Sequence, residues 1–472
     1  MSRRIELLLS AALAQACAAV GPDHTPPTAE LPAAFLAAGE GAAAAVPLVV
    51  GTPDLTGWWL GLGDDQLSQL VERALAEGLD MRTALARLTE ARALRGITAG
   101  ERFPSLDARL GYEHRRESEN TPLGAFAPET DIHSLGLDAA WELDLWGRVR
   151  RSVEAADRDV EVSVEDAHAA AVTVAAETAR WYVELRAFQR RLAIAEGNVG
   201  LQEQTLALVT SRRDAGLVGE LDVAQASANL ESTRSRVPTL RAGLRTAENR
   251  LAVLVGAAPG ALRAELTEAR PVPRVPREVA VGVPHDLLRR RADVRRAERA
   301  LAAETARIGV AEGDLYPRLS LAGSLGLASD GAQRLFDSDS VTGGFGPAVR
   351  WNLFAAGRLR ARVDAQVARA EGASLAWEAT VLRALEESEN ALTGFVREQE
   401  RRAALEAAAA QSRRASEVAR AQYTAGLTDF QVVIDSERAT ASLEDELAVS
   451  DAAVTSALVA LYKALGGGFG EL

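Results

Sequence analysis

The sequence predicts a mixed fold in which membrane-spanning strands and very long helices are built twice, by a tandem repeat. Three observations support it: one strand-to-helix junction recurs 210 residues later, each half has two stretches of alternating hydrophobicity, and each half continues into a helical segment of 67 residues. Of the 472 residues, 47% are hydrophobic but only 5% are aromatic. This composition suits long, closely packed helices better than a thick globular core.

The N-terminus has the pattern of an export signal. Residues 1–16 combine two arginines, a short apolar stretch and small residues ahead of Cys17. This arrangement fits an ordinary signal peptidase, and it also fits lipoprotein processing, which would make Cys17 the acylated N-terminus. Cys17 is the only cysteine, so no intramolecular disulfide can form. We expect an exported protein with a signal peptide at 1–16, followed by an extended N-terminal segment at 17–63.

Several function classes are disfavoured by composition. The formal net charge of −13 argues against nucleic-acid binding, which needs a basic surface. The five histidines are scattered without metal-ligand spacing, and neither a phosphate-binding loop nor a nucleophile elbow is present. We therefore expect no enzyme, no cofactor and no bound metal. No run of about 18 apolar residues follows the signal, so any membrane insertion must use strands.

The two halves of the chain hold a common register. A shift of 210 residues aligns WELDLWGRVRR (141–151) with WNLFAAGRLRA (351–361), and upstream a shift of 213 pairs Pro104 with Pro317. Register of this length does not arise by chance. The expected domains after the N-terminal segment are a first repeat at 64–256, a proline-rich linker at 257–284, a second repeat at 285–466 and a C-terminal tail at 467–472.

Each repeat contains two strands with unlike faces. Apolar side chains such as Leu106, Leu110 and Trp141 alternate with a polar set made of Asp107, Glu113, Asp138, Glu142 and Asp144. A soluble sheet packed on helices would explain the apolar face, but strands of about ten residues with an acidic second face are typical of an outer-membrane barrel with a water-filled lumen. We expect the five acidic residues to face that lumen. The smallest such barrels need about eight strands, so the missing strands must come from other copies of the chain.

A long helical segment follows the second strand of each repeat, at 147–213 and 357–423. Each segment has 67 residues, which gives a rod of roughly 100 Å, more than three times the hydrocarbon thickness of a bilayer. Most of each rod must therefore project into an aqueous space. Each rod ends at a glycine turn, and a second helix then returns antiparallel. The turns carry Gly216, Leu217, Gly426 and Leu427.

Several stretches together resemble the outer-membrane efflux protein family, the TolC-like outer-membrane factors, and within it the NodT-type lipoproteins. They include GWWLGLGDDQLSQLVERAL, WELDLWGRVR, LLRRRADVRRAE, GVAEGDLYPRL and YTAGLTDFQVVIDSERA, and they cover the whole mature chain. The resemblance implies a homotrimer whose twelve strands form one barrel and whose twelve helices form one periplasmic tunnel. It also implies lipid attachment at Cys17, docking to a periplasmic adaptor (membrane fusion protein) and coupling to an inner-membrane RND-type pump.

The expected function is the exit duct of a tripartite efflux system for small molecules. Two alternatives remain open at this point: the exit duct of a type I protein secretion system, and a periplasmic coiled-coil scaffold whose strands form a soluble sheet. Fold-level analogy alone separates small-molecule efflux from protein secretion. The resemblance places the protein in the outer membrane of a Gram-negative bacterium, with its helices in the periplasm.

A duct that is always open would breach the outer-membrane barrier, so we expect one end to close. The resemblance places Asp435 and Arg438 on an ionic constriction ring near the second glycine turn. Asp435 would line the narrowest point, Arg438 would pair across protomers, Glu437 lies beside them, and Asp222 of the first repeat is a further candidate. The alternative is an ordinary exposed pair worth under about 1 kcal/mol. The tips at Gly216, Leu217, Gly426 and Leu427 would meet the adaptor.

Overall fold

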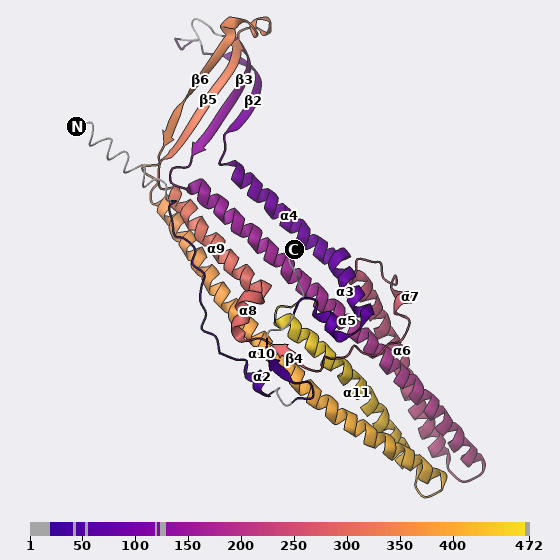
Figure 1. Cartoon of the computed structure of the whole chain (residues 1–472). Coiled ribbons are helices and arrows are strands. Elements are labelled where there is room, and N and C mark those ends of the chain that lie inside the picture. The colour runs from indigo at the N-terminus through magenta and orange to yellow at the C-terminus, as the bar shows by residue number, and fades with distance from the viewer. Residues whose placement is uncertain (1–18, 41–43, 52–54, 119, 123–128, 468–472) are drawn as a thin grey trace. The chain divides into compact units, whose positions relative to one another are not determined.

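A computed structural model describes residues 19–40, 44–51, 55–118, 120–122 and 129–467 of the chain. The expected signal peptide at 1–16, Cys17 and most of the expected tail lie outside the described residues. The chain forms two compact units (Figure 1), and each draws on both repeats. The strand unit consists of Met1–Thr28, Leu88–Ser163 and Ala297–Trp377, and the helical unit of Ala29–Arg87, Val164–Arg296 and Glu378–Leu472.

The strand unit contains a four-stranded antiparallel sheet in the order β2-β3-β5-β6. The strands run over Ser105–Arg116 (β2), Glu129–Leu143 (β3), Arg318–Ser329 (β5) and Val341–Arg350 (β6). Register places Leu106 opposite Ala139 and Leu137 opposite Leu325, so apolar side chains of neighbouring strands share one face, as predicted. Strands β2 and β6 each have one neighbour in this sheet and are its two open edges.

Neither face of β2 is covered by other described residues of the strand unit. Leu110 is 79% exposed and Phe345, on β6, is 93% exposed. A soluble sheet packed on helices would bury these side chains, so that alternative is wrong. Pro347, which fits poorly inside a strand because it has no N–H, lies on the edge strand β6, where proline is tolerated.

The second strand of each repeat ends before the helix begins. Strand β3 ends at Leu143 and β6 at Arg350, so Asp144, which we expected on the polar face of a strand, lies beyond β3. The Asp144 carboxylate accepts hydrogen bonds from the backbone N–H groups of Val149 (3.1 Å) and Arg150 (2.8 Å). Asp144 thus satisfies free donors at the start of the following helix instead of continuing the strand.

Four helices form two long hairpins, as predicted. Helices α5 and α10 have 67 residues each, and α6 and α11 have 35 each. Their bounds are Arg148–Asp214 for α5, Glu220–Leu254 for α6, Arg358–Thr424 for α10 and Phe430–Ala464 for α11. Figure 1 shows α6 returning beside the end of α5, and α11 beside the end of α10. Pro238 lies inside α6.

The remaining elements are shorter. Helices α4 (Leu79–Gly100) and α9 (Ala292–Gly313) precede the strands of the two repeats and have 22 residues each. The N-terminal segment, predicted to be extended, carries α2 (Leu36–Glu40), β1 (Leu48–Val50) and η2 (Trp58–Leu62), and the linker carries α7 (Arg263–Leu266) and β4 (Val279–Val281). Helix α3 (Asp65–Glu77) lies at the start of the first repeat, α8 (Pro284–Arg290) at the start of the second, and η3 (Ala332–Arg334) and η4 (Ser338–Ser340) lie between β5 and β6. Strands β1 and β4 pair in parallel, which joins segment and linker.

The core of the helical unit gathers apolar side chains from η2, α3 and all four long helices. Fully buried members include Leu67 and Leu70 of α3, Leu185 of α5, Leu392 of α10 and Leu458 of α11. Among the described residues, α11 is the one helix long and apolar enough to cross a membrane by length and composition. Half of its most apolar window is buried within the protein, as in the core helix of a soluble domain.

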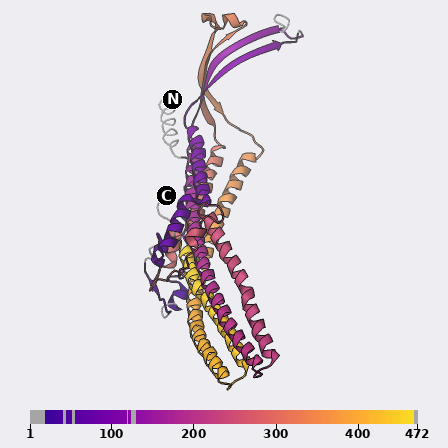
Figure 2. The ribbon, with the colours of Figure 1, turned by 90° about the vertical axis from the view of Figure 1, so that its right-hand side faces the viewer.

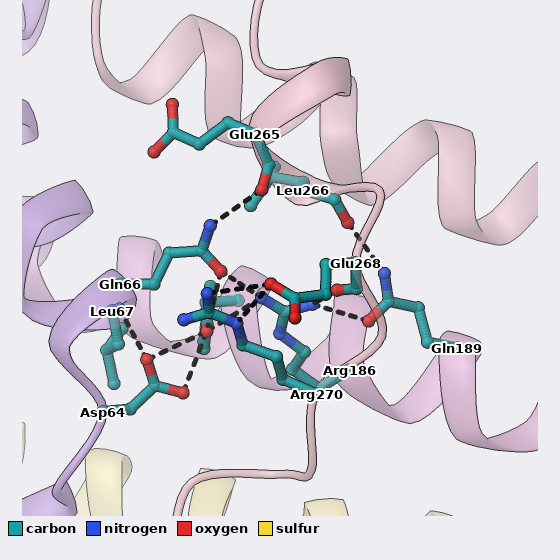
Figure 3. A network of polar contacts seen from close by, with 10 residues as sticks. Asp64, Gln66, Leu67, Arg186, Gln189, Glu265, Leu266, Glu268 and Arg270 are labelled. Carbon is teal, nitrogen blue, oxygen red and sulfur yellow. Dashed lines mark hydrogen bonds and ion pairs between the residues drawn. The ribbon is translucent and has the colours of Figure 1, made fainter.

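A buried polar network fixes the linker to α3 and α5 (Figure 3). The Arg186 side chain is fully buried and donates to Gln189 Oε1 at 2.6 Å, to the Glu268 carbonyl at 2.8 Å and to Gln66 Oε1. It also donates to the Tyr182 hydroxyl at 3.0 Å, and that hydroxyl donates to the Asp64 carboxylate at 2.9 Å. Burial raises the pKa of Tyr182 to about 12, so Tyr182 stays protonated and keeps donating.

Candidate functional site

The glycine turns end both hairpins at the same end of the helical unit (Figure 2). Gly216 has φ 72° and Gly426 has φ 75°, the left-handed region that glycine adopts readily. At the first turn, Leu217 N donates to the Arg212 carbonyl at 2.9 Å, which satisfies a carbonyl at the helix end. Leu217 is 66% exposed and Leu427 is 77% exposed. Each of the two turns therefore exposes an apolar side chain.

Asp435 and Arg438 lie on the exposed face of α11, near its start. The Asp435 carboxylate accepts a hydrogen bond from Gln431 Nε2 at 2.9 Å, one turn earlier on the same helix. Arg438 Nε donates to Asn229 Oδ1 of α6 at 3.0 Å, so Arg438 bridges the two return helices within one copy. Asp435 itself is exposed.

Glu437 points into the protein and not beside Asp435. Its side chain is 2% exposed and pairs with Arg420 of α10 at 2.8 Å. Thr205 of α5 donates to the same Glu437 oxygen at 2.9 Å. Among the described residues, the second oxygen, Glu437 Oε2, has no hydrogen-bond partner. Glu437 therefore ties α11 to both α10 and α5, just above the turns.

An apolar cluster lies near the contacts that Glu437 makes with Arg420 and Thr205. Its buried members come from α5, α6, the end of α10 and the start of α11: Val209, Ala226, Tyr423, Phe430, Val433 and Ile434. Arg212 of α5 donates to the Tyr423 carbonyl at 2.7 Å, and its guanidinium lies 4.7 Å from the centre of the Tyr423 ring. The hairpin ends thus pack as one body within a copy.

The sequence did not reveal Arg420 and Thr205, because each reaches Glu437 from another helix. The side of α11 on which Glu437 lies was predictable from the sequence. Residues two apart on a helix do not share a face, so Glu437 lies on a different side of α11 from Asp435. Asp222, the further candidate, is half-buried in the first turn of α6, where a carboxylate favours the helix N-terminus.

The acidic residues expected to face a lumen divide into two groups. Asp107 lies opposite Asp138 on one face of the sheet, and Arg109 lies 3.0 Å from the Asp138 carboxylate. Glu113 lies on the same face and pairs with Arg115 at 3.1 Å. Glu142 is held by Arg148 at 3.0 Å, and Asp144 lies beyond β3 at the start of α5.

Among the described residues, no group of three His, Cys, Asp or Glu side chains gathers as a metal site requires. The features that stand out are instead two hairpin tips with exposed leucines, an ionic tie above them, and a sheet with exposed apolar side chains and open edges. An apolar sheet face together with long helices is typical of an outer-membrane channel protein.

The chain belongs to the outer membrane efflux protein family, whose profile matches residues 70–257 and 283–467. Nodulation protein T of Rhizobium leguminosarum bv. viciae is 31% identical over 469 residues, which cover 98% of this chain and 92% of that protein. Outer membrane protein OprJ of Pseudomonas aeruginosa is 32% identical over 448 residues, covering 94% and 93%. These matches confirm the predicted family.

Solved structures agree. The structure of the outer-membrane channel OprN superposes with a TM-score of 0.87 at 38% identity and covers 95% of this chain and 99% of that one. A structure of CusC matches with a TM-score of 0.81 at 26% identity, covering 96% and 100%. The protein is thus an efflux protein of the Gram-negative outer membrane and not an enzyme, as predicted. A periplasmic coiled-coil scaffold does not fit this family, so that alternative is dropped.

Proposed function

We propose that three copies of this chain form the exit duct of a tripartite efflux system that exports small molecules across the periplasm and outer membrane. The observation that carries this proposal is the pair of open edges, β2 and β6, on a sheet with exposed apolar side chains. An unpaired strand edge is not tolerated in lipid, because its N–H and C=O groups would lack partners. Pairing β6 of one copy with β2 of the next supplies them.

Three copies bring twelve strands, which exceeds the minimum of about eight for a closed barrel. The long helices would then form a periplasmic tunnel below the barrel. Asp107, Glu113, Asp138 and Glu142 would line the lumen of the barrel, and Asp144 would lie at its lower rim. Lipid attachment at Cys17 is part of this proposal, as is the organisation into repeats at 64–256 and 285–466 with the linker at 257–284 between them.

The partners in this proposal are a periplasmic adaptor (membrane fusion protein) and an inner-membrane pump of the RND type. The exposed Leu217 and Leu427 at the hairpin tips, held by the turns at Gly216 and Gly426, suit contact with the adaptor. The names of relatives favour small molecules over proteins as cargo: they include a toluene efflux pump outer membrane protein of Pseudomonas putida and a pyoverdine export outer membrane protein of Pseudomonas aeruginosa. The type I secretion alternative has no comparable support.

The trimeric barrel is tested by placing one charge on each face of β2. Leu110→Arg puts an arginine on the apolar face, where it costs about 2–4 kcal/mol in lipid. Asp107→Arg puts the same side chain on the polar face, opposite Asp138. We expect the trimer fraction, measured by light scattering after mild detergent extraction, to fall at least tenfold for Leu110→Arg and to stay within twofold for Asp107→Arg.

Equal trimer fractions in the two variants would contradict the assignment of lipid and lumen faces. A parent protein that stays soluble in buffer, or that has the mass of one copy in detergent, would contradict the barrel itself. Because the parent contains one cysteine, Cys17, thiol crosslinks engineered between β2 and β6 in a Cys17→Ser background report the edge pairing directly.

The gate in this proposal is a ring of Asp435 carboxylates from three copies, with Arg438 beside each of them. We expect Asp435→Ala combined with Arg438→Ala to raise the single-channel conductance in planar bilayers several-fold, because the charged ring is removed from the narrowest point. Glu444→Ala, further along α11, is the control, since Glu444 pairs with Arg413 of its own copy at 2.6 Å. An unchanged closed state in the double variant would rule out this gate.

A further inference from the structure

We propose that Arg151, together with Gly147 and Gly309, forms a docking site for residues 19–23, and that this site confines the lipid-bearing N-terminus to the strand-to-helix junction of the first repeat. The inference rests on the proposed acylation of Cys17. The docking site itself consists entirely of described residues of the strand unit.

The Arg151 side chain is the centre of the site. Arg151 lies in the first turns of α5, is only 5% exposed, and makes three hydrogen bonds to the N-terminal segment. Its guanidinium donates to the carbonyls of Val20 (3.0 Å) and Gly21 (3.0 Å) and to the Asp23 carboxylate (2.7 Å). In return, Val20 N donates to the carbonyl of Trp146 at 2.9 Å. A buried arginine that donates three hydrogen bonds to one segment is specific for that segment.

Glycines allow the segment to approach the helices closely. A Cβ at Gly309 of α9 would lie 2.5 Å from the Val20 carbonyl oxygen, and one at Gly21 would lie 2.4 Å from Gly309 Cα. A Cβ at Gly147 would lie 2.5 Å from the Ala19 Cβ. Real Cβ atoms do not approach so closely, so the groove is shaped to the backbone of residues 19–21.

The positions that the repeat makes equivalent to Arg151 and Gly309 hold no docked segment among the described residues, and there the special residues are missing or unused. The shift of 210 residues puts Ala361 at the place of Arg151, and Ala361 is exposed. The shift of 213 puts Gly96 at the place of Gly309, and a Cβ there would meet nothing within 4 Å. Within one copy, Arg151 and the crowding at Gly309 therefore occur together with the docked segment, and the equivalent positions Ala361 and Gly96 lack both.

Aromatic side chains mark the level of the junction. The rings of Trp146 and Tyr316 stack with their centres 4.9 Å apart, and Trp146 Nε1 donates to the Pro317 carbonyl at 2.8 Å. Trp351 Nε1 donates to the Leu315 carbonyl at 3.1 Å. Tryptophan and tyrosine with polar atoms satisfied in this way are typical of the membrane–water interface.

Chain length turns docking into a constraint on the lipid. Cys17 precedes Ala19 by two residues, which span at most about 7 Å. With residues 19–23 docked, an acyl chain on Cys17 must enter the leaflet next to the junction. If residues 19–28 were released, the terminus could move about 35 Å away. The Arg151 site thus holds the lipid next to the strands, so that the lipid and the strands attach the protein to the membrane at one place.

Hydrogen exchange of the purified full-length protein tests docking, with two variants and two matched controls. Gly309→Ala fills the groove, and Gly96→Ala makes the same change at the open position of the other repeat. Arg151→Ala removes the clamp, and Arg150→Ala removes its neighbour, which pairs with Asp144 at 3.4 Å. Alanine favours helix more than glycine, so neither glycine variant should unfold its helix.

We expect Gly309→Ala and Arg151→Ala to raise amide exchange in peptides covering residues 19–28 at least tenfold, and both controls to stay within twofold of the parent. Unchanged exchange in Arg151→Ala, or equal exchange in the two glycine variants, would overturn the docking site. Cys17→Ser, which cannot be acylated, should keep the protection. Loss of protection in Cys17→Ser would mean that the lipid, and not Arg151, holds the segment, and would also overturn it.

Confinement of the lipid is measured separately, by crosslinking. With a photoreactive palmitate analogue, we expect crosslinks from the parent to concentrate on peptides around Trp146 and Pro317, and those from Arg151→Ala to spread along the protein. Identical crosslink patterns would overturn confinement. Intact mass reports acylation on its own, so a parent without an acyl adduct refutes the proposed lipid attachment regardless of the exchange result, and channel conductance tests the proposed duct independently of both.

Discussion

Arg186→Met is expected to loosen the helical unit more than any other single substitution on α5. The change leaves Gln189 Oε1 buried without its Arg186 donor, leaves Gln66 Oε1 with only the Tyr182 hydroxyl at 3.3 Å, and removes the same donor from the Glu268 carbonyl. A buried acceptor without a donor costs about 1–3 kcal/mol, and with two further acceptors weakened the loss should reach about 2 kcal/mol or more, roughly thirtyfold in an opening equilibrium. The linker and α3 should open first, since Arg186 of α5 donates to both of them.

Hydrogen exchange in peptides from α3 (Asp65–Glu77) and from linker residues 257–284 is the measurement, because the proposed trimer would have no simple two-state unfolding free energy. Tyr182→Phe should cost only about 1 kcal/mol, since Asp64 keeps its hydrogen bond from Leu67 N at 3.0 Å. Arg190→Met, one turn further along α5 at an exposed position, is the control and should change exchange little. Equal exchange in Arg186→Met and Arg190→Met would show that the network does not stabilise the linker.

Local sequence signals were sufficient for most of the fold. Glycine at the end of a long apolar stripe defines a helix end, and alternation defines a strand, because each depends on neighbours only a few residues away. The ends of α5 and α10 therefore fell within one residue of the prediction. The strand ends were less accurate, since Asp144 exchanges a strand position for two hydrogen bonds to the next helix, and alternation alone does not show that competition.

The polar contacts that distinguish the two repeats were not predictable in the same way. Arg186 meets Gln66 across 120 residues, and Glu437 meets Thr205 across 232. Such pairs depend on how helices far apart in the sequence pack, which no periodicity reports. The difference between Arg151 and Ala361 was visible in the aligned junctions, but its meaning required the position of residues 19–23, which carry no periodic signal.

Removing Arg420 should release the hairpin ends from each other. Arg420→Gln leaves the Glu437 carboxylate, 2% exposed, without its ion-pair partner. Breaking one side of a buried pair costs about 3–5 kcal/mol, because the remaining charge stays desolvated. The tie between α10, α11 and α5 then weakens, and we expect exchange in the turn at Tyr423–Phe430 and the open probability of single channels each to rise at least tenfold.

The double variant separates loss of the tie from loss of a charge. Arg420→Gln with Glu437→Gln removes both charges, and replacing both partners of a pair costs far less than removing one. Exchange and open probability should therefore return toward the parent. Arg413→Gln on the same helix breaks an exposed pair with Glu444 and should have little effect, since exposed pairs contribute under about 1 kcal/mol.

If Arg420→Gln raised exchange at the turn without changing open probability, the tie would stabilise each copy alone, and closure would depend on the Asp435 ring between copies. If the double variant were as open as Arg420→Gln, the opening would result from lost packing of the Arg420 side chain against the helices and not from the uncompensated charge. If open probability rises in Arg420→Gln and returns to the parent value in the double variant, the hairpins of one copy must separate when the gate opens. Glu437 then acts inside each copy, while Asp435 acts between copies.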